Sequence, residues 1–192
     1  NRFLRLRARC VEMQRIATAV RGEPHDASGA SHELRAPALD RLLWVFLRLL
    51  LSQQAIERFL RATDGAAIAK NLEQLQVRQR DAEKKGDERM LRSIVDAIAT
   101  AELRKDNHEK ARGNAEFISL ELDRIEQKIQ ALTEMAISHQ NPDELSVQVD
   151  AVADGMAQTE QTIRELQAIT GLGAEETTPT ILGGDLQAET DR

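Results

Sequence analysis

Arginines are the side chains whose number and spacing most clearly suggest chemistry in this sequence. Six fall within residues 1–21, opposed there only by Glu12: Arg2, Arg5, Arg7, Arg9, Arg15 and Arg21. A guanidinium is always charged and binds phosphates and carboxylates, so the segment predicts contact with an anionic surface or an acidic partner. Phe3 and Cys10, and likewise Leu6 and Met13, are seven residues apart. The same segment therefore also fits an amphipathic helix that simply packs in a bundle.

The histidines give weaker signals. His108 lies in a polar stretch with Asp106, Glu109 and Arg112, which has the residue types of a catalytic or metal cluster. A solvated helical stretch explains the same residues, and we prefer it. His25 and His32 fall in a Gly/Pro/Ser-bearing segment without partners at ligand spacing. No paired Glu-x-x-His motif occurs, so we predict neither a metal nor a cofactor.

Motifs of the common enzyme classes are also missing. The sequence holds no glycine-rich phosphate loop, paired-cysteine zinc pattern, nucleophile elbow or His-Glu-x-x-His helix. We therefore predict a non-enzymatic protein with no small-molecule substrate. The alternative is a helical-bundle enzyme or metal carrier that uses the His108 region. Nucleic-acid binding is disfavoured, because the net charge is −6 and the basic segment has no aromatic residue beyond Phe3.

The elements that must position these residues are helices. Aromatic residues make up 3% of the chain, with only 10 glycines and 4 prolines, which favours helices over a β-fold. Over residues 87–138, small or apolar residues recur every three or four positions without a proline, which predicts a helix of about 75 Å. The row consists of Leu91, Ile94, Ile98, Ala101, Ala115, Ile118, Leu122, Ile125, Ile129, Leu132 and Ala136.

Shorter helices are expected to fold back on this long one. Lys84-Lys85-Gly86-Asp87 has the residues of a tight turn between antiparallel helices. A further helix is expected from Pro142 to Thr170, and the Thr180–Gly183 island is a candidate docking peptide. The fold class is thus all-α, an elongated antiparallel helical hairpin or coiled-coil bundle of about five helices with a disordered C-terminal tail. The expected parts are a basic amphipathic helix at 1–21, a linker at 22–36, a helical coiled-coil domain at 37–173 and a disordered acidic tail at 174–192.

The helix expected from Pro37 to Thr63 is apolar nearly all round between residues 42 and 51. Such a helix must be covered on more than one face. The cover is the rest of the chain, a second copy or a lipid interface. Because the face is so broad, we expect self-association, with these candidate contact residues: Leu42, Leu43, Phe46, Leu49, Leu50 and Phe59.

Charge is distributed unevenly along the chain. Residues 1–63 carry 11 basic and 6 acidic side chains, whereas residues 64–192 carry 15 and 26. Either the basic end faces an anionic surface, or it folds onto the chain's own acidic helices. No apolar run is long enough to span a bilayer, and because the chain begins at Asn1 we expect an anchor, a signal or another domain to precede it. Cys10 is the only cysteine, which fits a reducing compartment.

Together these patterns predict a coiled-coil scaffold or interaction protein at the cytoplasmic face of a membrane. Its expected partners are other copies of itself and an anionic membrane surface or a membrane protein. A basic N-terminal amphipathic helix combined with a long helical hairpin also resembles the architecture of the PspA and ESCRT-III group. That resemblance implies membrane remodelling as the alternative function.

Overall fold

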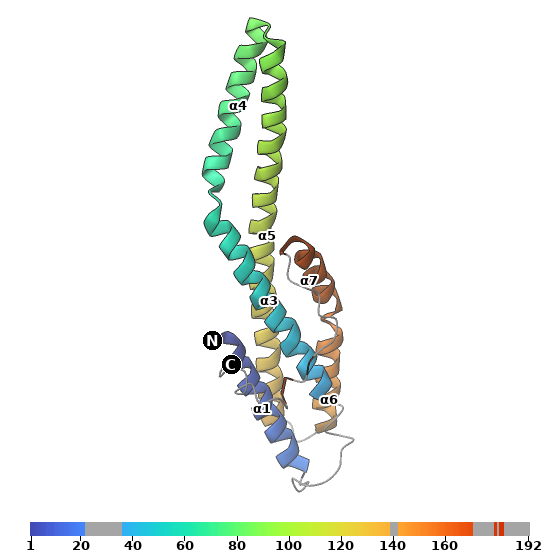
Figure 1. Ribbon diagram of the computed structural model, residues 1–192. Helices are drawn as coiled ribbons and strands as arrows, with labels where there is room; N and C mark the ends of the chain where they lie inside the picture. Colours follow the sequence, from blue (N-terminus) through green and yellow to red (C-terminus); the bar gives the residue numbers. More distant parts are fainter. Residues whose placement is uncertain (22–35, 139–141, 171–178, 180, 183–192) are drawn as a thin grey trace, which may run out of the picture. The chain divides into compact units, whose positions relative to one another are not determined.

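The computed structural model describes residues 1–21, 36–138, 142–170, 179 and 181–182. All the regular secondary structure within them is α-helical, as predicted, with no strand. The helices are α1 (Arg2–Arg21), α3 (Ala36–Ala62), α4 (Gly65–Lys85), α5 (Glu88–Ser138), α6 (Pro142–Asp154) and α7 (Ala157–Thr170), as labelled in Figure 1. The predicted linker lies outside these residues except for Ala36, and the predicted tail lies outside them except for Pro179, Ile181 and Leu182.

Both ends of α4 are capped, and the turn after its C-terminal end has the residues that the sequence predicts. Asp64 is the N-cap, and its side chain accepts hydrogen bonds from the amides of Ala66 and Ala67 at 2.9 and 3.1 Å. Gly86 follows the last turn with φ +67°, in the left-handed region that favours glycine. The Asp87 carboxylate then accepts a hydrogen bond from the Met90 amide at 3.0 Å at the start of α5. This turn reverses the chain, so α4 and the first half of α5 form an antiparallel hairpin (Figure 1).

The long helix and its apolar row are confirmed. α5 is continuous over 51 residues, through Gly113. Eight residues of the predicted row are buried, and all but the first two lie in the C-terminal part of the helix: Ile94, Ala101, Ile118, Leu122, Ile125, Ile129, Leu132 and Ala136. The C-terminal half of α5 is therefore the central helix of a core, whereas the N-terminal half has only one lightly buried edge.

The helix expected from 142 to 170 is interrupted. α6 ends at Asp154, Gly155 and Met156 form a turn, and α7 begins at Ala157. Glycine is among the poorest helix formers, which makes Gly155 a natural place for the break. Met156 is fully buried at the turn, so the interruption places an apolar side chain in the core.

Packing divides the chain into two compact units whose limits fall inside α3 and α5. Unit 1 consists of Asn1–Ser52 and Ile118–Arg192, and unit 2 of Gln53–Phe117. The sequence predicted one helical domain from 37 to 173 with the basic helix outside it. In the structure α1 packs within unit 1, and α3 and α5 each contribute residues to both units.

Unit 1 holds most of the buried side chains. The first half of α3 and the second half of α5 supply its largest buried residues, and α1, α6 and α7 supply the rest. Hydrogen bonds and ion pairs link these helices. Arg41 of α3 forms two hydrogen bonds with Glu160 of α7 at 2.7 and 3.0 Å. Thr159 of α7 donates to the buried Glu121 carboxylate of α5 at 2.7 Å, and Arg124 contacts both of them.

Unit 2 buries far less. Its buried apolar residues are Ile56, Ile68, Ala82, Ile94 and Ala101, while Leu72 and Leu75 of α4 are half-buried. Several large apolar side chains are exposed in the same unit: Phe59, Val77, Met90, Val95, Leu103 and Phe117. A hairpin of two helices buries only the side chains between them, so apolar residues on its other faces stay exposed.

Candidate functional site

The basic helix α1 is fixed in unit 1 by its apolar side. Phe3, Leu6, Cys10 and Met13, the residues of the predicted seven-residue repeat, are all buried. This agrees with the bundle-packing interpretation of the segment. Because this apolar side is already covered, the accessible side chains of α1 are mainly its arginines, together with Leu4.

Arg2 is held by acidic residues of α5. Its guanidinium forms ion pairs with Glu126 at 2.9 Å and Asp123 at 2.6 Å, and it lies 5.9 Å from the centre of the Phe46 ring. The hydrogen bond to Glu126, more than any other contact, raises the pKa of Arg2 above its usual value. Arg2 therefore acts as a clamp between α1, α3 and α5.

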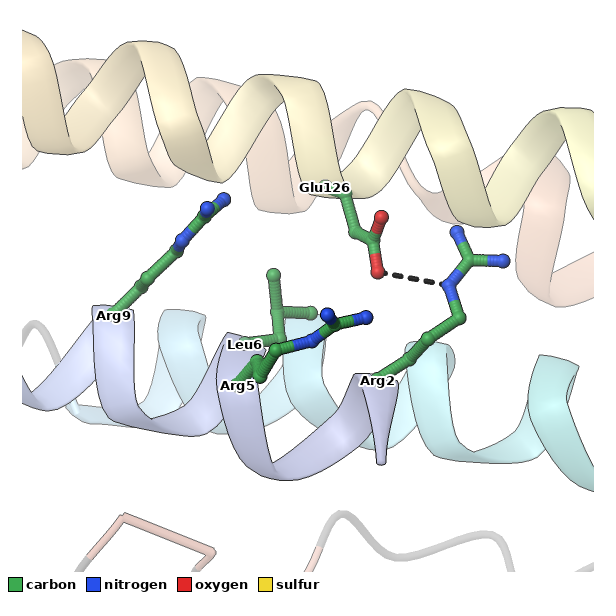
Figure 2. Close-up of a pocket in the computed structure, with 5 residues that line it drawn as sticks. All are labelled: Arg2, Arg5, Leu6, Arg9 and Glu126. Atoms are coloured by element: carbon green, nitrogen blue, oxygen red, sulfur yellow. Dashed lines mark hydrogen bonds and ion pairs between the residues drawn. The ribbon is translucent and has the colours of Figure 1, made fainter.

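Arg5 and Arg9 stand one helical turn apart beside this clamp. Figure 2 shows Arg9 extending from α1 toward the helix that carries Glu126, and Arg5 extending along α1 in the direction of Arg2. With Arg2, Leu6 and Glu126 they line a cavity of about 240 Å³. Both are exposed, and within the described part of the chain neither has a carboxylate partner. The cavity thus combines three guanidinium groups with one carboxylate, and that carboxylate is already paired with Arg2.

The remaining arginines of the predicted set have other environments. Arg7 points to a different side of α1, where it is half-buried and donates to the backbone oxygen of Ile181 at 3.2 Å. Arg15 is exposed and lies 3.9 Å from Glu12. The side chain of Arg21 is outside the described residues. The structure therefore brings together Arg2, Arg5 and Arg9 and separates them from Arg7.

This arrangement can bind a small anion. Arg5 and Arg9 offer planar sets of N–H donors that match phosphate or carboxylate oxygens, and Leu6 provides an apolar floor. The cavity is smaller than the usual range for drug-sized ligands, so it suits one anionic group rather than a whole cofactor. Among the described residues no cluster of three or more His, Cys, Asp and Glu side chains could hold a metal ion.

The candidate self-association residues on α3 lie mostly inside the chain's own core. Leu42, Leu43, Phe46 and Leu49 are fully buried in unit 1. Of the three possible covers for this helix, the rest of the chain is the one found. Leu50 is half-buried and Phe59, in unit 2, is 43% exposed.

The polar stretch around His108 is explained by ion pairs along α5 and by a contact of the histidine with α4. Lys105 pairs with Glu109, Asp106 with Lys110, and Arg112 with Glu116, each one turn along α5. His108 itself is half-buried against Gly65, where a Cβ atom would lie 2.5 Å from the imidazole Cε1. His25 and His32 lie outside the described residues.

Sequence reasoning missed Asp40. It is an acidic residue within the apolar start of α3 and is only 5% exposed. Its carboxylate accepts hydrogen bonds from the amides of Ile181 and Leu182. A lone acid between Leu39 and Arg41, followed by an apolar run, was the available signal, but nothing in the pattern identifies its distant partners.

Comparison of the chain with known proteins assigns it to no family. No protein-family model, curated protein or solved structure matches the chain. None of the helices that the structure describes has the length and apolar run needed to cross a bilayer.

Proposed function

We propose that this protein is a non-enzymatic helical scaffold that docks on an anionic membrane surface through Arg5 and Arg9 and associates with further copies through unit 2. One observation carries the docking proposal. Arg5 and Arg9 have no carboxylate partner among the described residues, and they stand next to Arg2, whose charge is already compensated. Lipid phosphate and carboxylate groups have the charge and donor preference to occupy that position.

The way in which α1 would contact the membrane follows from which of its side chains are buried. A helix that inserts into the interface must present its apolar side to the acyl chains. On α1 that side, with Leu6 and Cys10, is packed in the core. Electrostatic docking without insertion is therefore favoured over the remodelling alternative, which requires an inserting helix.

The self-association proposal rests on unit 2. Its hairpin leaves Val77, Met90, Val95 and Leu103 between 45% and 60% exposed. A second copy that packs on unit 2 would cover part of this exposed apolar surface. Analytical ultracentrifugation of the full chain checks this part: we expect a concentration-dependent mass above that of the 21.5 kDa monomer.

Co-sedimentation with phosphatidylcholine vesicles, with and without phosphatidylserine, tests the docking surface. The variant Arg5→Gln/Arg9→Gln is compared with Arg89→Gln/Arg104→Gln, which removes the same charge from exposed positions in unit 2. At about 1 kcal/mol for each arginine near an anionic surface, the first variant should bind roughly thirtyfold more weakly. The control should bind like the wild type, and high salt should release all three proteins.

Two results would contradict the docking proposal. One is a wild-type protein that, at low salt, binds vesicles with phosphatidylserine no better than vesicles without it. The other is an equal loss of binding in both double variants, which would show that overall charge rather than the α1 cavity governs the interaction.

A further inference from the structure

A short C-terminal segment is bound in unit 1 by a buried carboxylate. Asp40 uses one oxygen, Oδ1, to accept hydrogen bonds from two successive amides, those of Ile181 and Leu182, both at 2.8 Å. The Nε of Arg7 donates to the carbonyl oxygen of Ile181 at 3.2 Å. The backbone of Ile181 is therefore held at both its N–H and its C=O group.

The side chain of Ile181 is bound as well as its backbone. It is 5% exposed, whereas Leu182 is half-buried and Pro179 is exposed. Cys10 of α1 lies close by: after burial, the charge of Asp40 is the second cause that raises the pKa of its thiol. The peptide is thus held between α1 and the start of α3, with one aliphatic side chain covered.

Asp40 has no other hydrogen-bond or ion-pair partner in the described part of the chain. A buried carboxylate without partners is strongly unfavourable, because it loses its hydration and gains nothing in return. Two successive backbone N–H groups satisfy it, and no side chain substitutes for them. The site is therefore constructed around a peptide backbone.

We propose that Asp40 and Arg7 form a peptide-binding site for an extended segment with two consecutive amides and an aliphatic first residue. Residues 181–182 fill it from within the same chain, and the same segment of a second copy can fill it in exchange. Three hydrogen bonds and one buried side chain make a small contact, so release and rebinding are expected to be easy. This proposal is independent of docking on membranes and of contacts in unit 2.

The test uses a fluorescein-labelled peptide of residues 176–186 and the full chain, followed by fluorescence anisotropy. Ile181→Asp vacates the site by opposing Asp40 with a second carboxylate, and Ile181→Pro/Leu182→Pro vacates it without adding charge, because proline has no backbone N–H to donate. Both vacated proteins should bind the peptide at least about tenfold more tightly than the wild type, whose own segment competes at high effective concentration. Adding Asp40→Ala to either variant should reduce peptide binding at least about tenfold, because the charge-assisted hydrogen bonds are lost.

Circular dichroism of every variant accompanies the titrations. The proposal would be overturned if the vacated variants were folded but did not bind the peptide. It would also be overturned if the variants that carry Asp40→Ala still bound the peptide as tightly. Loss of the helical signal in both vacated variants would also overturn it, because residues 181–182 would then be an inseparable part of the fold rather than an exchangeable ligand.

Discussion

The contact between Gly65 and His108 makes a prediction at the scale of single residues. A Cβ at position 65 would lie within 3.0 Å of three atoms of the imidazole ring, whereas a Cβ at Gly113 would meet nothing within 4 Å. Gly65→Ala should therefore destabilise the protein by about 1–3 kcal/mol through overpacking. Gly113→Ala, in the exposed interior of α5, should stabilise it by up to about 1 kcal/mol. Urea unfolding of the two variants measures both effects.

The two glycine variants also serve as each other's control, since each adds a single methyl group. If Gly65→Ala were as stable as the wild type, His108 would have to be free to move away from α4. The double variant Gly65→Ala/His108→Ala should recover stability relative to Gly65→Ala, because the side chain that collides with the new methyl group is removed.

At the scale of elements, the pair between Arg41 and Glu160 attaches α7 to α3. The hydrogen bond from Arg41 is the main cause that lowers the pKa of Glu160, against the opposing effect of burial. The carboxyl group is thus more acidic in the folded than in the unfolded chain. The stability that it contributes is present above the unfolded pKa, near 4.5, and is lost as the pH falls through the lower folded value.

Glu160→Gln should therefore be less stable than the wild type at neutral pH, and the difference should shrink as the pH falls below about 4.5. Urea unfolding across this range measures the difference. Glu165→Gln, an exposed change in the same helix, should show a much smaller difference. A Glu160→Gln difference that stays constant with pH would mean that packing, rather than charge, is responsible.

Prediction from sequence succeeded where the information was local. The apolar row of α5 and the turn at Gly86 depend on spacing and on residues next to one another. It was incomplete where distant residues decide the outcome. The hydrogen bonds to Asp40 come from residues 141 and 142 positions away, and no periodicity reports such a pairing.

The candidate site divides in the same way. A basic α1 with an apolar side was predictable from composition and the seven-residue repeat. Which arginines are compensated was not, because the partners of Arg2 lie on α5, more than 120 positions away. For the same reason, the apolar face of α3 did not by itself decide between the rest of the chain, a second copy and a lipid interface as its cover.

At the scale of the whole molecule, the reactivity of the Cys10 thiol measures how readily unit 1 opens. Burial raises the pKa of its thiol to about 12, so almost no thiolate exists near neutral pH, and the side chain is fully covered. Ellman's reagent should therefore react slowly with the folded protein and rapidly in urea. A Leu4→Cys variant supplies the control, since residue 4 is 53% exposed on the same helix: it should add one fast-reacting thiol. Fast reaction of Cys10 in the folded wild type would contradict this description of α1.

The division of the chain into units has a consequence for its synthesis. Unit 2 is one continuous stretch, so its hairpin can form while the ribosome is still translating the rest. Unit 1 joins the first part of the chain to the last, and the helix that carries Leu42, Phe46 and Leu49 emerges long before α6 and α7. Until then this apolar helix is covered only by α1 and by the second half of α5. Part of its apolar surface is therefore expected to stay exposed until translation is nearly complete, which makes the nascent chain prone to aggregation.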